Sequence, residues 1–454
     1  MSTSKGVMAA AAGRPSSVYA WYTVSLCMIA YILSFVDRQI IALLIVPIQA
    51  DLQITDTQFS LLIGFAFALF YAIMGLPLAR WADVGPRPFI ISAGIIVWSI
   101  ATATCGLART FWQLFLARIG VGVGEAALSP TAYSIITDSF PKSKLGLALG
   151  VYSVGAFLGS GLAFIVGGGV VEWLEGLGGL SLPIIGTIKP WQGAFIIVSL
   201  PGVLVGLLFY LTVRDPERTG VVDAGDGQSG KGYTLRQVLS YIRGHRASFT
   251  AHFLGFGLLS LKLYALLSWA PAYLQRVFDL SKGEAGLYLG VVVLFANTTG
   301  VLSSGWLVDF FTRRGHGDAP LRAGVVGSIG VVIPAALFSS MPGLPSTLAV
   351  LALAFYFASF PMATSAAGLQ LMAPNRMRAQ VTALFFLFMN LFGITGGATL
   401  VALLTDFVFR DVNAVGYSMS IICAVAAVLG GLTLARGLKY FRATVQTLAA
   451  EAAE

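Results

Sequence analysis

Long apolar runs separated by short polar segments make up most of this sequence. Twelve of the runs are long enough to cross a bilayer as a helix, which takes ~20 apolar residues. They cover roughly residues 19–49, 57–79, 88–108, 111–140, 145–170, 191–213, 248–278, 283–309, 322–341, 347–372, 379–407 and 416–438. A charged, glycine-rich segment divides them six and six. The pattern predicts an all-α membrane protein whose twelve transmembrane helices form two pseudo-symmetric six-helix bundles.

The positions of the runs predict five parts in the chain. An N-terminal tail precedes the first bundle, a linker with one short amphipathic helix at Leu235–Ile242 joins the bundles, and a C-terminal tail follows the second bundle. In chain order the five parts are 1–18, 19–213, 214–246, 247–440 and 441–454.

The composition supports a polytopic membrane protein. Of the 454 residues, 57% are hydrophobic and 11% are charged, whereas soluble domains average about 25% charged residues. The net charge of +8 does not indicate a nucleic-acid partner, because Lys and Arg stand at the ends of the runs and not in one patch. Their excess in alternate loops predicts cytoplasmic termini. We expect a multi-pass protein of the plasma (inner) membrane.

The two halves repeat a charged segment at the same place. Asp83 and Arg87 follow the second run, and Asp309, Arg313 and Arg314 follow the eighth. Parallel six-helix repeats with a substrate site near the midplane are the architecture of one large transporter class. The five residues either set the topology or form ties that make and break at an inner gate, and their repetition favours the gate.

The fourth run contains two charges, Arg118 and Glu125. Each costs ~2.5–3.5 kcal/mol at the centre of a membrane helix on lenient scales, so such residues are functional by default. Seven residues separate them, so both project from one face, two turns apart. The glycines at 120, 122 and 124 allow a neighbouring helix or a substrate to approach closely. The alternative is a purely structural pair that ties the fourth helix to its neighbours.

Further charges lie at a similar depth. At 1.5 Å per residue, Asp37 lies about 18–19 Å from the outer end of its helix, Glu125 about 21 Å and Lys262 about 22 Å. Asp37 and Arg38 are adjacent in sequence and point about 100° apart, so at most one of them faces a cavity squarely. Lys262 is either a substrate ligand or a tie between the bundles.

Both signs of charge therefore share one central layer. Burial disfavours an ionised carboxylate, whereas a neighbouring Arg stabilises it, and an acid between these influences can exchange protons near neutral pH. We assign proton coupling to Asp37 and Glu125. Substrate binding is assigned to Arg38, Arg118, Glu125, Lys262 and Tyr356.

The tenth run is aromatic and uncharged, with Phe355-Tyr356-Phe357 followed by Phe360. If it lines the cavity, one wall is polar and the opposite wall is apolar, which suits an amphiphile with a charged head and an acyl tail. The alternative is an aromatic helix that faces lipid. No metal-ligand cluster, phosphate loop or nucleophile–base constellation occurs in the sequence. We expect no enzyme activity, no cofactor and no metal.

These features resemble the major facilitator superfamily over essentially the whole chain. The loop after the eighth run matches that superfamily's signature through Gly305, Asp309, Arg313 and Arg314. The loop after the second run keeps Asp83 and Arg87, with Ala79, Val84 and Pro86 at positions where the signature has Gly, Arg and Gly. The Arg118-x-x-x-Gly122 spacing resembles the fourth-helix signature that is linked to proton coupling.

Within the superfamily, the chain is most similar to the spinster family of lysolipid and sphingolipid transporters. The resemblance is carried by Val36-Asp37-Arg38, by Gly122–Ala126 and by Pro374–Ala383. It implies that Asp37, Arg118 and Glu125 handle substrate and protons. Some organic-anion symporters share the Asp-Arg pair of the first helix and remain the alternative.

The sequence thus predicts a proton-coupled secondary transporter that works by alternating access as a monomer. Its expected partners are protons, the lipid bilayer and an amphiphilic anion such as a lysophospholipid or a sphingolipid-like molecule. A proton-coupled symporter of small organic anions is the alternative, and a membrane sensor or a scramblase would be a different class. The direction of transport stays open.

Overall fold

The computed structural model describes residues 15–182, 186–218, 234–374 and 377–451. Most of the expected N-terminal tail, the middle of the expected linker, Asn375 and Arg376 of the motif before the eleventh run, and the last three residues lie outside the described residues. Within them, twelve helical segments are long and apolar enough to cross a membrane, which confirms the twelve predicted spans. The chain forms two compact units, which we call unit 1 and unit 2.

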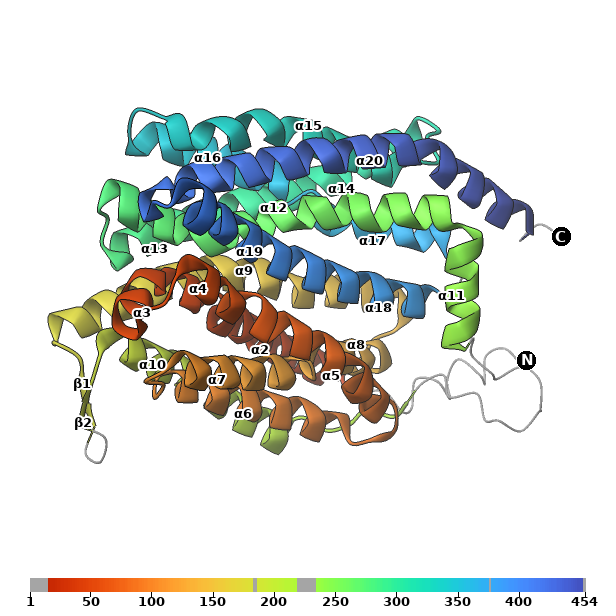
Figure 1. The fold of residues 1–454 in the computed structure, drawn as a ribbon. Coiled ribbons are helices and arrows are strands. Elements are labelled where there is room, and N and C mark those ends of the chain that lie inside the picture. The colour runs from red at the N-terminus through yellow and green to blue at the C-terminus, as the bar shows by residue number, and fades with distance from the viewer. Residues whose placement is uncertain (1–14, 183–185, 219–233, 375–376, 452–454) are drawn as a thin grey trace. The chain divides into compact units, whose positions relative to one another are not determined.

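Unit 1 comprises residues 1–52 and 66–227, and Figure 1 shows its helices running side by side. Its main contacts are those of α9 with α2 and of α10 with α6. An antiparallel hairpin, β1–β2, pairs Leu180 with Ile188 at one end of the unit. The elements are α2 (Ser17–Leu43), α3 (Ile45–Leu52), α5 (Phe65–Val84), α6 (Arg87–Cys105), α7 (Phe111–Glu125), α8 (Leu128–Ser139), α9 (Lys142–Gly176), β1 (Leu180–Leu182), β2 (Gly186–Ile188) and α10 (Pro190–Thr212).

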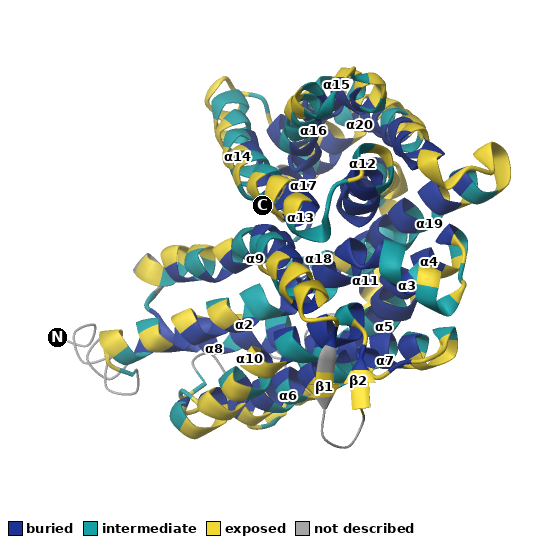
Figure 2. Ribbon diagram, turned by 90° about the vertical axis from the view of Figure 1, so that its left-hand side faces the viewer, coloured by how far each residue is buried: buried dark blue, intermediate teal, exposed yellow. Residues whose placement is uncertain are grey.

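Unit 2 comprises residues 53–65 and 228–454. Its central helix is α12, which packs most extensively against α20 and is largely dark blue in Figure 2 because its side chains are buried. The elements are α4 (Asp56–Ile63), α11 (Leu235–Gly244), α12 (Arg246–Phe278), α13 (Lys282–Val292), η1 (Val293–Asn297), α14 (Thr298–Arg313), α15 (Ala319–Leu337), η2 (Phe338–Ser340), α16 (Leu344–Ala358), α17 (Pro361–Met372), α18 (Arg378–Met389), η3 (Asn390–Thr395), α19 (Gly396–Leu403), η4 (Leu404–Phe409), η5 (Val412–Ala414) and α20 (Val415–Glu451).

Several spans are interrupted where the sequence predicted one continuous helix. The fourth span breaks between α7 and α8, directly after Glu125. Pro130 explains the break, because it lacks the N–H that would bond to the carbonyl of Ala126 and its ring crowds that oxygen. The tenth span breaks in the same way before Pro361. The eighth and eleventh spans contain the π-helical turns η1, η3 and η4, a rare feature that is frequent at functional sites.

The second span is divided between the two units. Its first part, α4, belongs to unit 2, whereas α5 belongs almost wholly to unit 1. The two parts meet at Gly64, which ends α4 and interrupts the regular helix before Phe65. The expected division, with residues 19–213 in one bundle, therefore differs from the compact units at residues 53–65.

Glycines set the close packing of α9 on α2. A Cβ at Gly159 would lie 2.7 Å from Cβ of Phe35 and 2.8 Å from the carbonyl oxygen of Ile32. Only a residue without a side chain fits there. On the same helix, a Cβ at Gly150 would meet nothing within 4 Å.

This contrast predicts opposite effects for one substitution at two positions of α9. Gly159→Ala is expected to lower the unfolding temperature, because overpacking costs about 1–3 kcal/mol. Gly150→Ala is expected to raise it, because Ala is about 0.8–1 kcal/mol more favourable than Gly in a helix. Thermal unfolding of both variants in the same detergent checks the prediction, and shifts in one direction would contradict it.

Candidate functional site

The central charges of unit 1 meet where α2 approaches α7. Nη2 of Arg38 lies 2.5 Å from Oε2 of Glu125 and forms an ion pair with it. Oγ of Ser34 donates a hydrogen bond of 2.7 Å to the same oxygen. The other carboxylate oxygen of Glu125 has no hydrogen-bond partner among the described residues. The side chain of Glu125 is fully buried, whereas that of Arg38 keeps 11% exposure.

Aromatic rings surround the guanidinium of Arg38. Its carbon atom lies 4.7 Å from the ring centre of Phe35, 4.5 Å from that of Phe67 and 5.4 Å from that of Tyr71. These distances fall within the ≈6 Å range of cation–π attraction. The rings hold the guanidinium in place without neutralising it, so its charge is balanced by the carboxylate of Glu125.

Asp37 lies on another side of α2, as the angle between adjacent helical residues predicts. It is 1% exposed, and its carboxyl faces Arg118 of α7 together with Trp98 and Thr102 of α6. Nη1 of Arg118, a fully buried residue, donates a hydrogen bond of 3.2 Å to the backbone oxygen of Asp37. The central layer of unit 1 therefore holds two cations and two acids.

The sequence grouped Arg118 with Glu125, but the ion pair of Glu125 is with Arg38. The seven-residue spacing does place both side chains on one face, but about 10 Å apart along the axis, which is too far for direct contact. Residues of α2 meet each of them instead. The sequence did not reveal this exchange of partners, because it depends on how α2 is set against α7.

Glycines and the helix break position Glu125. A Cβ at Gly122 would lie 2.6 Å from the carbonyl oxygen of Phe67, and one at Gly124 would lie 2.6 Å from the backbone nitrogen of Trp98. This confirms that the glycines of the fourth span admit neighbouring helices. Glu125 is the last residue of α7, so its side chain lies at the break before α8.

Lys262 lies within unit 2, on α12, and is fully buried. Its Nζ has no hydrogen-bond partner among the described residues. The neighbouring titratable group is Cys423 of α20, whose sulfur lies 3.5 Å from the backbone oxygen of Lys262. Lys262 is thus enclosed in the packing of α12 against α20.

Tyr356 lies on α16 of unit 2 and is half-buried. Its ring centre is 5.0 Å from that of Phe357 and 5.5 Å from that of Phe360, in edge-on contacts. The aromatic character of the tenth span is therefore concentrated at its break, beside a partly exposed hydroxyl-bearing ring.

The residues predicted for the inner gate occupy two kinds of environment. Arg87 is buried and pairs with Asp138 and with Asp215, 2.7 Å from the latter, and not with Asp83. The four other members, Asp83, Asp309, Arg313 and Arg314, are exposed. Of these, Arg314 lies 4.2 Å from the ring centre of Phe310.

Two buried polar residues of unit 2, Asp318 and Asn297, were not predicted from the sequence. In unit 2, the buried Asp318 pairs with Arg322 at 2.6 Å and with Arg442 at 3.3 Å. Asn297 lies in the π-helical turn η1, is 5% exposed, and its Oδ1 has no hydrogen-bond partner in the described part of the chain. An isolated Asn inside an apolar run is the signal that could have identified it.

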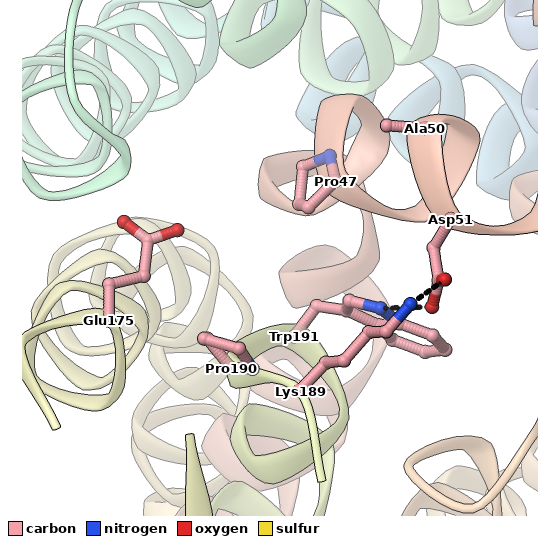
Figure 3. Close-up of a pocket in the computed structure, with 7 residues that line it drawn as sticks. All are labelled: Pro47, Ala50, Asp51, Glu175, Lys189, Pro190 and Trp191. Carbon is pink, nitrogen blue, oxygen red and sulfur yellow. Dashed lines mark hydrogen bonds and ion pairs between the residues drawn. The ribbon is translucent and has the colours of Figure 1, made fainter. Parts of the chain in front are cut away.

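Two cavities of unit 1 lie at the end that carries the β1–β2 hairpin. One of them has a volume of about 350 Å³. In it, Asp51 pairs with Lys189 and accepts a hydrogen bond from Trp191, and Glu175 lies opposite (Figure 3). A neighbouring cavity of about 880 Å³ is lined in part by Arg109 and shares Asp51 and Lys189. Neither cavity contains a residue that the sequence assigned to the site.

Comparison with known proteins places the chain in a family. The sequence model of the Major Facilitator Superfamily matches residues 27–397. An MFS-type efflux pump of Mycolicibacterium smegmatis is 28% identical over 90% of both chains. A probable L-galactonate transporter of Escherichia coli is 25% identical over 69% of this chain and 66% of its own. The sphingosine-1-phosphate transporter SPNS2 of Xenopus tropicalis is 25% identical over 92% of this chain and 82% of its own.

A solved structure agrees with the sequence relatives. The crystal structure of a bacterial homolog to the human lysosomal transporter Spinster, in an inward-facing and unoccupied conformation, has a TM-score of 0.78 and 26% identity to this chain. It covers 95% of this chain and 98% of its own. The protein is thus a multi-pass membrane transporter and not an enzyme. It belongs to the major facilitator superfamily and, within it, resembles the spinster family.

Proposed function

We propose that this transporter is proton-coupled and moves an amphiphilic anion, of the lysophospholipid or sphingolipid type, by alternating access. The observation that carries the proposal is the ion pair between Arg38 and Glu125. It joins a carboxylate that can take up a proton to a guanidinium that can bind an anionic head group. The relative named as the sphingosine-1-phosphate transporter SPNS2 supports the lipid class.

The ion pair couples the binding of the proton to the binding of the anion. The proton competes with Arg38 for Glu125, and the anion competes with Glu125 for Arg38. A proton on Glu125 removes the anionic partner of Arg38, and the partly exposed guanidinium then binds the head group. An anion on Arg38 likewise leaves Glu125 without a counter-ion and favours its protonation. Leaving one buried charge unpaired costs about 3–5 kcal/mol. Proton and anion are therefore expected to bind and leave together.

Asp37 and Arg118 are the second pair of opposite charges in the central layer of unit 1. Arg118 is anchored on the backbone of Asp37, and both are almost completely buried. We assign Arg118 to the electrostatic attraction of the head group, with Asp37 as its counter-ion and as a second site for a proton. Intramembrane ionisable residues commonly serve such relays.

The apolar part of the substrate needs a different surface. We assign it to the aromatic group at the break of the tenth span, with Tyr356 as its polar member. Lys262 is not required for head-group binding in this scheme, because its Nζ is enclosed within unit 2.

Alternating access requires contacts that form and release. Residues 53–65 belong to unit 2 but are joined to unit 1 at both ends of the segment, and we assign to this segment contacts that form and release during transport. At the other end of the spans, Arg87 is already paired inside unit 1. We therefore assign the inner gate chiefly to the exposed charges Asp83, Asp309, Arg313 and Arg314.

The orientation and assembly follow from the same proposal. Lys and Arg are in excess in the loops on the side of the termini, and on this basis we propose that both termini lie in the cytoplasm and that the protein resides in the plasma membrane. A monomer suffices, because the proposed charges lie within one chain.

Flux into proteoliposomes tests the proposed function. Accumulation of a labelled lysophospholipid is expected to increase about tenfold for each pH unit of an imposed gradient if one proton is coupled, since one unit corresponds to about 1.4 kcal/mol. Empty liposomes are the control. Lipid movement that ignores the gradient would indicate a scramblase, and binding without flux would indicate a sensor.

A symporter of small organic anions is the second candidate. The probable L-galactonate transporter among the relatives favours it, and the pair of Arg38 with Glu125 would serve a sugar acid by the same competition. This candidate predicts gradient-driven uptake of a soluble carboxylate that lysolipids do not inhibit. Uptake of galactonate and of lysolipid by one preparation separates the two.

A further inference from the structure

The short helix α11 lies across the end of α12 in unit 2. It spans Leu235–Gly244 and runs crosswise to the transmembrane helices of that unit (Figure 1). Thr234 and Gln237 form a capping box at its start, so the helix has a defined beginning. The helix that follows, α12, is long for a membrane span. At about 1.5 Å per residue it extends about 50 Å, beyond a hydrocarbon core of about 30 Å. Its first turns and α11 therefore reach the level of the lipid head groups.

One face of α11 is fixed on unit 2. Val238 is fully buried in a cluster that includes Phe249 and Met372. The hydroxyl of Tyr241 donates a hydrogen bond of 2.8 Å to the backbone oxygen of Met372. This attachment keeps the helix in one orientation, so its remaining faces are presented in a fixed way.

A second apolar stripe on α11 has no cover among the residues that the structure describes. Leu235 is 54% exposed and Leu239 is 40% exposed. They are four residues apart and so lie on one side of the helix. At about 100° per residue, Arg243 and Arg236 follow the leucines around the helix by about 40–100°.

The charges beside this stripe are all positive. Arg236, Arg243 and Arg246, which opens α12, are exposed and form no ion pair in the described residues. α11 itself contains no acidic residue. Leucines bordered by unpaired arginines form the pattern of a helix that lies in a membrane interface and attracts anionic lipids.

We propose that α11 binds anionic phospholipids of the leaflet at this end of unit 2. Leu235 and Leu239 enter the boundary of the acyl chains, and Arg236, Arg243 and Arg246 contact the phosphate groups. Positive charge selects anionic over zwitterionic head groups, which a purely apolar contact would not do. The competing occupant is an acidic partner protein. If such a protein covered α11, Leu239 would not contact lipid.

A fluorescent probe on α11 tests the proposal in full-length protein. The three native cysteines are buried, so Leu239→Cys can be labelled selectively with an environment-sensitive dye. The matched control is Ser240→Cys at an exposed position, which lies about 100° further around the helix. Both proteins are placed in phosphatidylcholine vesicles that contain brominated phosphatidylglycerol or, separately, brominated phosphatidylcholine at the same fraction.

For the dye at position 239, quenching by the brominated anionic lipid is expected to be at least about twice as strong as quenching by the brominated zwitterionic lipid. The dye at position 240 is expected to show weak quenching by both. Adding Arg236→Gln and Arg243→Gln is expected to make the two lipids equal at position 239 while quenching persists. Equal quenching before these substitutions, or none by either lipid, would overturn the proposal, and the latter result would favour a protein partner.

Discussion

Glu125→Gln is expected to abolish gradient-driven accumulation of substrate while preserving exchange of substrate across the membrane. Gln cannot release a proton, so it resembles the protonated state in which Arg38 is available to an anion. Exchange needs only loading and reorientation, whereas accumulation needs the proton to leave. With one coupled proton, accumulation by the variant is expected to be about tenfold lower than that by the wild-type protein for each pH unit of the gradient. Parallel counterflow and gradient-driven assays measure the two activities.

Arg38→Gln is the matched substitution at the other side of the pair. It removes the proposed ligand of the head group, so both exchange and accumulation are expected to fall. The contrast between the variants separates a proton site from an anion site. Full response of Glu125→Gln to the gradient would refute the proton assignment, and undisturbed exchange by Arg38→Gln would refute the anion assignment.

The stability of these variants provides an independent check. Breaking a buried ion pair costs about 3–5 kcal/mol, because one charge is left without its partner. The double variant with Gln at both positions leaves no charge of the pair uncompensated. We therefore expect a double-mutant cycle of unfolding free energies to show a coupling of about 0.5–3 kcal/mol between Arg38 and Glu125.

The sequence predicted the twelve spans because few backbone structures are stable in lipid. Backbone N–H and C=O groups have no partners in hydrocarbon, so each apolar run of sufficient length has to be a helix or part of a closed barrel. The same run does not show where the helix is interrupted. The break after Glu125 depends on Pro130, which the apolar pattern passes over, and the π-helical turn at Asn297 has no comparable signal in the sequence.

The sequence pointed to the buried charges of unit 1, but it did not predict how they pair. Burial cost alone identifies Asp37, Arg38, Arg118 and Glu125. Which charge meets which depends on the helix contacts set by Gly122 against α5 and by Gly159 against α2. The polar contacts of α4 with Arg276 and Asp406 likewise have no signal in the sequence, since these residues lie more than two hundred positions away.

A disulfide between positions 57 and 406 is expected to stop transport and to release it again on reduction. Residues 53–65 are docked on unit 2 by several polar contacts. Arg276 binds both carboxylate oxygens of the buried Asp56, at 2.6 and 2.9 Å. The backbone nitrogen and hydroxyl of Thr57 donate to Asp406 at 2.7 and 2.6 Å. Thr57→Cys with Asp406→Cys replaces these two contacting side chains by thiols, which can form a disulfide where the Cα atoms lie within about 7 Å.

The proposed mechanism makes this docking reversible, because the segment is covalently joined to unit 1. Locking it is expected to reduce flux of the oxidised protein to the level of empty liposomes, with recovery in a reducing agent. The native cysteines are buried and free, so each single-cysteine variant serves as a control that keeps its flux under oxidation. Full flux with a complete cross-link would show that the docking is permanent.

Asp56→Asn tests the same attachment without a cross-link. It leaves Arg276 without its carboxylate and weakens the docking by about 3–5 kcal/mol, enough to shift a two-state equilibrium a hundredfold or more. Ser60, which is fully buried beside Thr399, reports the release: a cysteine placed there is expected to react faster with a maleimide in the Asp56→Asn background. Asp51→Asn removes the partner of Lys189 inside unit 1 and is expected to leave that rate unchanged. Equal rates in all backgrounds would mean that the Asp56–Arg276 pair does not control the docking.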